Sequence, residues 1–267
     1  MKQLGNKKVF SVSILLLFLV LRYVKHFYAY LIYNKEIWNG LSVDLRVSLI
    51  NYNQMAIVFI FVAGFFKNPF EMLGLNRGFT KGMIFAFLFN LIMLLGFGFM
   101  NSFQVNLSFA SIHRGMILAG FSEEFMYRAF LFGLLYFYCG WGFFSAVLIP
   151  SFFFGIGHLY QANNVSEGIS IFMFTALANA GFAWFYLAWD SLWMVVFLHG
   201  FMDITWDMFA IQTNVTGNAQ VNLFRFGTLI AAIIYSRYIG KKFNRIDLKD
   251  KLWKNVSSKE LTLRFPS

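Results

Sequence analysis

Cysteine is almost absent from this chain, since its 267 residues contain only Cys139. A single cysteine excludes an intramolecular disulfide and any metal cluster held by several thiolates. Proline is also rare, with three residues, and no linker or internal repeat is visible, so we expect a single integral membrane domain over residues 1–267. Charged residues make up only 13% of the chain, whereas an average soluble protein has about 25%.

Apolar residues take the place of the missing charges. Hydrophobic residues make up 59% of the chain, 37 residues are phenylalanine, and the mean hydropathy is +0.62. A soluble core of this length could not hide so much apolar surface, and runs of roughly 20 apolar residues predict membrane spans. We therefore expect an all-α, polytopic membrane helix bundle of about eight transmembrane helices. The expected spans lie near residues 9–33, 46–66, 82–100, 116–138, 141–158, 169–187, 192–211 and 223–238.

Basic residues are concentrated in one set of loops and give the chain a net charge of +10. By the positive-inside rule, both termini are expected in the cytoplasm, with residues 239–267 as a basic cytoplasmic tail that can contact membrane lipid. Nucleic-acid binding is not supported, because these residues adjoin a membrane span and no nucleic-acid motif accompanies them. The first span begins like a signal sequence, but Arg22 and Lys25 replace the small residues of a cleavage site, so we expect it to be retained.

Two adjacent acids, Glu123 and Glu124, lie inside the fourth expected span. A carboxylate at membrane depth costs a few kcal/mol or more, so intramembrane acids usually face the bundle interior and mark function. On a helix the two side chains point roughly 100° apart, and Glu124 shares a face with Arg128. We expect Glu124 to pair with Arg128, leaving Glu123 free to titrate or hold a water. The alternative is an interfacial ion pair with a solvated Glu123.

Two of the four histidines, His158 and His199, lie in or at the ends of expected spans. His199 and Asp203 are four residues apart and share a helical face. The order of the spans places these three residues and the two glutamates in the same half of the bilayer, where they can converge. The alternative is that each histidine is a hydrogen-bonded packing residue.

These residue types indicate attack by water on a carbonyl group. A glutamate and a histidine can deprotonate a shared water, and a second histidine with a neighbouring carboxyl can stabilise the oxyanion. A serine or cysteine nucleophile is not indicated, because Ser122 and Ser151 lack a histidine and an acid at suitable spacing. Two histidines with carboxylates also form catalytic zinc sites, although a His-Glu-x-x-His motif is missing. We expect no cofactor, with zinc as the alternative.

The motifs Glu-Glu-x-x-x-Arg, Phe-x-x-x-His and His-x-x-x-Asp follow one another at residues 123–128, 154–158 and 199–203. In this order, on separate apolar helices, they resemble the CPBP family, the intramembrane endopeptidases related to the type II CAAX prenyl protease and called Abi in bacteria. The resemblance covers roughly residues 116–211, the expected catalytic core region. The phenylalanine motif is weak by itself, because phenylalanine is so common in this chain.

The resemblance implies a role for each motif residue. The catalytic residues implied are Glu123, His158, His199 and Asp203. The first two would activate the water and the last two would form the oxyanion site, with Glu124 and Arg128 supporting them. Relatives often carry asparagine where Asp203 stands, and an aspartate donates to an oxyanion only when protonated. The resemblance also implies a glutamate mechanism without a metal.

The motifs do not separate the substrates of this family, which include prenyl-protein processors, pheromone-maturation proteases and bacteriocin self-immunity proteins. We expect a membrane-associated peptide or protein as substrate. The length and the absence of organelle signals predict a bacterial cell-membrane protein, for which prenylated substrates are not expected. Two other classes stay open. A proton-coupled transporter component would also bury ionisable residues, though usually with inverted repeats, and a non-catalytic immunity or membrane interaction protein would tolerate loss of the acids.

Overall fold

The computed structural model describes residues 7–23, 35–211, 215–242 and 252. Within these ranges the chain forms helices joined by turns and loops, with no β-strand, which confirms the expected all-α class. The helices are α1 (Lys7–Tyr23), α3 (Lys35–Gly40), α4 (Val43–Phe65), α5 (Pro69–Met72), α6 (Phe79–Met100), α7 (Phe109–Ile112), η1 (His113–Glu123), η2 (Phe125–Tyr138), α8 (Phe143–Gly157), η3 (Leu159–Gln161), α9 (Val165–Trp189), α10 (Leu192–Met208) and α11 (Ala219–Lys242).

Membrane-spanning helices are the main building blocks of this fold. The segments long and apolar enough to cross a membrane are Val43–Phe65, Phe79–Met100, Phe143–Gln161, Val165–Trp189 and Ala219–Gly240. Large apolar side chains cover their outer faces; Ile60, Phe99 and Leu148 are each about 70% exposed. Such faces are stable against lipid rather than water. The chain is therefore a multi-pass membrane protein.

The expected count of eight spans is not confirmed. The first and seventh expected spans correspond to α1 and α10, each with 17 described residues, and the fourth is divided between η1 and η2. Residues 24–33 of the first expected span lie outside the described part of the chain, as does most of the expected tail at residues 239–267.

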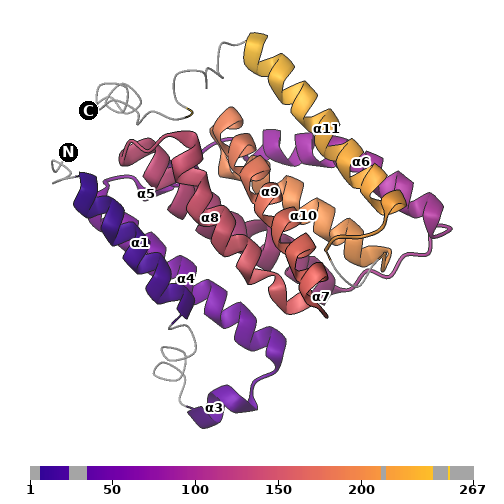
Figure 1. Cartoon of the computed structure of the whole chain (residues 1–267), viewed down its shortest axis with the longest axis horizontal. Helices are drawn as coiled ribbons and strands as arrows, with labels where there is room; N and C mark the ends of the chain where they lie inside the picture. Colours follow the sequence, from indigo (N-terminus) through magenta and orange to yellow (C-terminus); the bar gives the residue numbers. More distant parts are fainter. Residues whose placement is uncertain (1–6, 24–34, 212–214, 243–251, 253–267) are drawn as a thin grey trace.

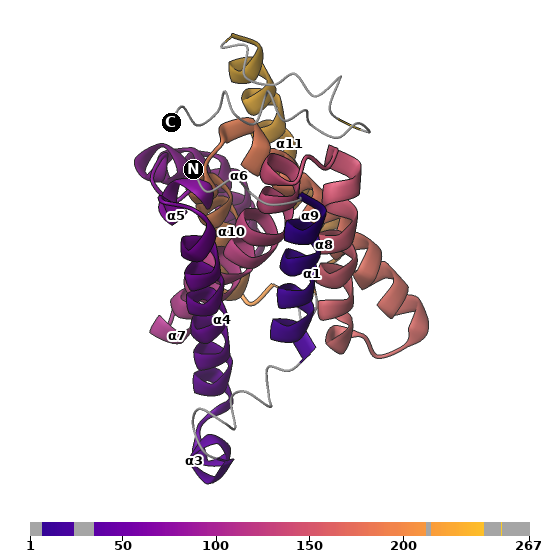
Figure 2. The ribbon, with the colours of Figure 1, turned by 90° about the vertical axis from the view of Figure 1, so that its left-hand side faces the viewer.

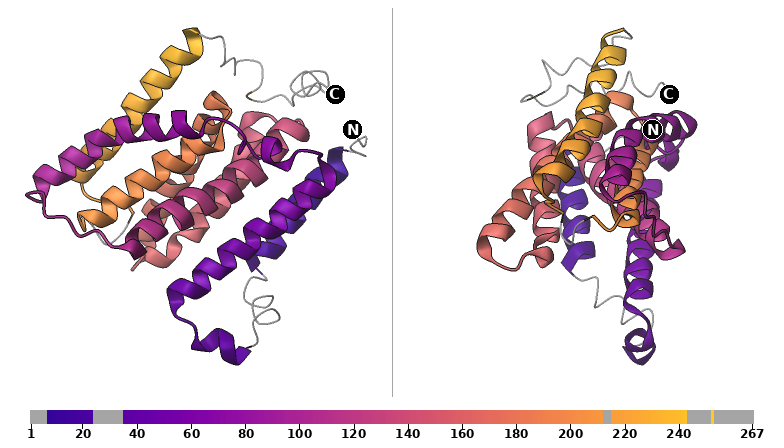
Figure 3. Two further views of the ribbon diagram at one scale, coloured as in Figure 1. Left: turned by 180° about the vertical axis from the view of Figure 1, so that it is seen from behind. Right: turned by 90° about the vertical axis from the view of Figure 1, so that its right-hand side faces the viewer.

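The bundle is built around η2, whose side chains are buried throughout except for the half-buried Tyr127. Helices α1 and α8 pack against η2, while α10 packs against η1 and α6. In Figures 1 and 3, α1 and α4 lie on one side of the bundle and α6 and α11 on the other, with α8, α9 and α10 between them. Figure 2 shows α3 beyond the end of α4, apart from the other helices.

The fourth expected span is wound more widely than an α-helix. Both η1 and η2 have π-helical winding, in which an N–H group bonds to the carbonyl five residues earlier. At the end of η2, for example, the N–H of Cys139 donates to the carbonyl of Leu134 at 3.1 Å. Short π-helical turns inside helices often occur at functional sites. Here Glu123 and Glu124 lie at the junction of η1 and η2.

Two glycines allow η1 and α10 to cross in close contact. A Cβ atom on Gly120 would lie 2.9 Å from the Cα of Gly200, and one on Gly200 would lie 2.9 Å from the Sδ of Met116. Small residues at such crossings let two helix backbones approach closely in a membrane. Because Glu124 follows Gly120 by four residues and His199 adjoins Gly200, this crossing brings the second glutamate to the second histidine.

Candidate active site

Glu124 is fully buried and forms an ion pair with Arg128. The Nε atom of Arg128 lies 3.0 Å from Oε2 of Glu124, and neither side chain is more than 1% exposed. The guanidinium also lies over the rings of Phe154 and Phe182, with its central carbon 5.0 and 5.4 Å from the ring centroids. The expected pairing of Glu124 with Arg128 is confirmed, and the pair is buried among the helices.

The other oxygen of Glu124 binds the second histidine. Nδ1 of His199 lies 2.6 Å from Oε1 of Glu124, and Nε2 of His199 lies 3.6 Å from Oδ2 of Asp203. Exposure of the side chains rises along this chain of contacts, from 0% for Glu124 to 15% for His199 and 44% for Asp203. Arg128, Glu124, His199 and Asp203 therefore form a polar network that joins η2 to α10.

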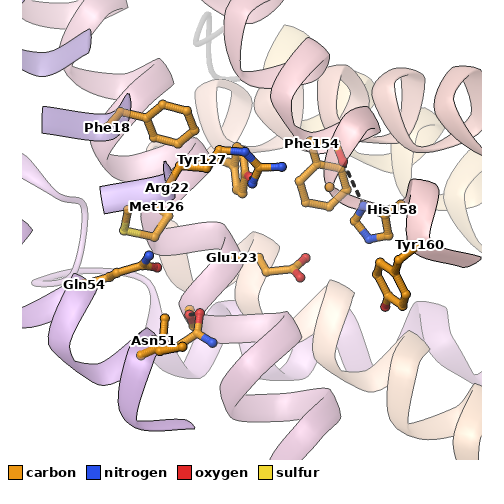
Figure 4. Close-up of a pocket in the computed structure, with 13 residues that line it drawn as sticks. Phe18, Arg22, Asn51, Gln54, Glu123, Met126, Tyr127, Phe154, His158 and Tyr160 are labelled. Atoms are coloured by element: carbon orange, nitrogen blue, oxygen red, sulfur yellow. Dashed lines mark hydrogen bonds between the residues drawn. The ribbon is translucent and has the colours of Figure 1, made fainter. Parts of the chain in front are cut away.

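Glu123 points the other way, into a separate pocket of about 200 Å³ that is bounded by α1, α4, η1, η2 and the end of α8 (Figure 4). His158 lines the same pocket, and its Nδ1 bonds to the carbonyl of Phe154 at 2.8 Å. When Nδ1 carries the proton of this bond, Nε2 is left as a hydrogen-bond acceptor. The half-buried Glu123 forms no ion pair within the described residues.

Three polar side chains of α1 and α4 that line this pocket were not expected from the sequence, namely Arg22, Asn51 and Gln54. Nη1 of Arg22 donates to Oη of Tyr127 at 3.0 Å, and Oγ of Ser122 donates to Oδ1 of Asn51 at 2.7 Å. Gln54 donates to a carbonyl of α1 at 2.8 Å. Asn51 and Gln54 lie three residues apart in an expected span, so their shared helical face was a usable signal. Arg22 carried no such signal, because it lies at the end of its helix.

The six motif residues thus lie in two adjacent groups. Glu123 and His158 share the pocket, whereas Glu124, Arg128, His199 and Asp203 form the network behind it. His199 and Asp203 are not among the residues that line the pocket. Catalytic zinc usually has three protein ligands. Within the described residues, no three histidine, cysteine or acidic side chains gather closely enough to hold a metal ion.

A buried acid, an arginine and a histidine within a bundle of apolar helices are typical of the polar interior of an intramembrane protein. Residues 104–205 match the model of the family described as type II CAAX prenyl endopeptidase Rce1-like. The match contains all three motifs and confirms the resemblance to the CPBP family over this part of the chain. Comparisons with curated proteins and with solved structures found no match. Helices α1 and α4, which complete the pocket, precede the matched region.

Proposed function

We propose that this protein is an intramembrane endopeptidase that hydrolyses a peptide bond of a membrane-associated peptide or protein. The observation that carries this proposal is that Glu123 and His158 line one pocket inside the helix bundle (Figure 4). They come from different helices and are 35 positions apart in the sequence, so the fold has to bring them together. A carboxylate and an imidazole facing the same space are the two groups needed to activate a water.

In the proposed reaction, Glu123 accepts a proton from the water as the water oxygen bonds to the carbonyl carbon. The π electrons of the carbonyl move to its oxygen and form an oxyanion. His158 positions the same water through Nε2, since its Nδ1 is held by a backbone carbonyl. When the C=O bond re-forms, the C–N bond breaks and the leaving nitrogen takes the proton from Glu123. The products are a carboxyl group and an amine, and no metal is needed.

The network of Arg128, Glu124, His199 and Asp203 supports this reaction from outside the pocket. Glu124 and Arg128 neutralise each other, and Glu124 fixes the ring of His199 through Nδ1. Nε2 of His199, next to Asp203, is then the ring atom left to act on a substrate. We assign the stabilisation of the oxyanion to His199 with protons on both ring nitrogens and to Asp203 in its protonated form, because only N–H and O–H groups can donate to an oxyanion. This assignment requires substrate to extend from the pocket toward the exposed end of the network. Oxyanion donors of this kind typically contribute about 10²–10³ in kcat.

The domain organisation, the location and the substrate class are also part of this proposal. Residues 1–267 would form one integral membrane domain with its catalytic core at residues 116–211, in the cell membrane of a bacterium. The family description names a type II CAAX prenyl endopeptidase. For this chain we propose the broader class of membrane-associated peptides or proteins, which it meets within or beside the lipid.

The decisive experiment compares the purified protein with its Glu123→Gln variant. Both are reconstituted in liposomes with a library of membrane-associated peptides, and cleavage products are identified by mass spectrometry. We expect cleavage by the native protein and none by Glu123→Gln at equal protein abundance. Glu71→Gln, the same substitution in α5 and away from the pocket, serves as the matched control and should cleave normally.

Each outcome separates the protease from the other function classes. Cleavage that persists in Glu123→Gln would remove the proposed base from the mechanism. A cellular phenotype that survives this substitution, with no cleavage by the native protein, would favour a non-catalytic immunity or interaction protein. Proton-coupled solute uptake that depends on Glu123 would favour a transporter component.

A further inference from the structure

Arg22 is a cation in the candidate active site for which the water-activation mechanism has no use. It lies in α1 and lines the pocket together with Glu123 and His158 (Figure 4). Its one hydrogen bond in the described structure goes from Nη1 to Oη of Tyr127, at 3.0 Å. No aspartate or glutamate among the described residues forms an ion pair with it. A guanidinium has five N–H donors, so most of its donors remain for another acceptor.

The guanidinium is held in place from two sides. Tyr127 contacts one side, and a Cβ atom on Gly157 would lie only 3.2 Å from Nη2 of Arg22. Gly157 directly precedes His158, so the absence of a side chain there leaves room for the guanidinium beside the histidine. Arg22 also lies over the ring of Phe153, with its central carbon 5.9 Å from the ring centroid. These contacts hold Arg22 at the pocket rather than in the lipid.

A cation that faces a polar pocket between the helices of a membrane protein usually has a partner or marks a substrate path. Glu123 cannot serve as a permanent partner, because the proposed mechanism needs its carboxylate for the water. The planar guanidinium fork binds a carboxylate through two parallel hydrogen bonds. The pocket is also smaller than the 300–1,000 Å³ typical of sites for drug-sized ligands, so the group that binds Arg22 has to lie within a few residues of the cut bond.

We propose that Arg22, positioned by Tyr127, binds a carboxylate of the peptide substrate, supplied by its C-terminus or by an acidic side chain near the cut bond. This proposal rests on the proposed protease function and names the chemistry of its substrate. It also gives α1, which lies outside the matched family region, a part in substrate selection.

The test uses the full-length protein in liposomes and one cleavable peptide in three forms. The forms are the free C-terminal acid, the C-terminal amide, and an amide with a glutamate introduced next to the cut bond. We expect the native protein to cleave at least one carboxylate form with a kcat/KM roughly tenfold or more above that of the plain amide, as charge-assisted hydrogen bonds imply. Comparison of the acid with the glutamate form identifies the source of the carboxylate.

Substitution at Arg22 separates substrate binding from a structural tether between α1 and η2. Arg22→Gln should bring the ratio of the carboxylate form to the plain amide close to one, mainly through KM. Arg22→Lys should keep part of the ratio, and Tyr127→Phe should lower it by leaving the guanidinium unanchored. Arg114→Gln, outside the pocket and with a native side chain 46% exposed, is the matched control and should keep the native ratio.

Three results would overturn the inference, and they are of two kinds. Equal cleavage of all three forms by the native protein, or an unchanged ratio in a folded Arg22→Gln variant, would refute the carboxylate subsite alone and leave the protease proposal standing. If Arg22→Gln does not fold, Arg22→Lys and Tyr127→Phe provide the same ratio. No cleavage of any form by the native protein, in excess of the Glu123→Gln background, would refute the protease proposal and the subsite together.

Discussion

Replacing Arg128 by methionine should destabilise the protein, although Arg128 does not line the pocket. The substitution keeps an apolar side chain of similar length and removes the charge. It leaves Glu124, which is 0% exposed, without the cation 3.0 Å from its Oε2 atom. It also removes the contacts of the guanidinium with the rings of Phe154 and Phe182.

The expected loss follows from these contacts. Breaking a buried ion pair by removing one partner typically costs about 3–5 kcal/mol. The other oxygen of Glu124 keeps His199 at 2.6 Å, so we expect the lower part of that range. A domain of 150–250 residues loses about 2–4 °C in Tm for each kcal/mol. A loss of about 3 kcal/mol therefore corresponds to roughly 6–12 °C.

Thermal unfolding in detergent measures this effect, with Glu123→Gln as the comparison. Glu123→Gln should keep nearly the native Tm, because Glu123 is half-buried and forms no ion pair in the described structure. The double variant Glu124→Gln, Arg128→Met should recover much of the loss, since replacing both partners of a buried pair is often neutral. A native Tm for Arg128→Met, or a loss in the double variant equal to the sum of the single losses, would refute this account of the pair.

Three further predictions concern the metal, the cysteine and the orientation. Activity should survive dialysis against a strong chelator, and stoichiometric zinc that is lost in His158→Ala and restores activity when added back would contradict this. Burial raises the pKa of Cys139, which follows η2, to about 11. Since only the thiolate reacts, labelling of Cys139 by a thiol reagent should stay slow at pH 8 and become faster only as the pH approaches 11. Fast labelling at pH 8 would contradict the buried position. Counting spans from a cytoplasmic amino terminus puts the pocket toward the extracytoplasmic side, so an impermeant thiol reagent added to cells should label a cysteine at Asn163 and not one at Lys81, both in a Cys139→Ser background. The opposite labelling pattern would mean that the pocket faces the cytoplasm.

The class of this protein and its local pairings could be predicted from the sequence. Long apolar runs with few charges specify membrane helices whatever their packing, because the cost of leaving backbone groups unpaired in lipid is local. The pairing of Glu124 with Arg128 is also local, since four-residue spacing puts both side chains on one helical face. The family motifs could be read for the same reason, because each lies within five or six consecutive residues.

The contacts between residues of different helices depended on how the helices pack against one another. The contact of Glu124 with His199 depends on the close crossing of η1 and α10 at Gly120 and Gly200, which no spacing along one helix specifies. The division of the motif residues into a pocket and a buried network depends on the direction in which each helix turns its faces. Arg22 reaches the pocket only because α1 packs beside η2, 105 residues away from Tyr127 in the sequence. Local periodicity determines which side chains share a face, whereas contacts between distant helices depend on the fit of whole surfaces.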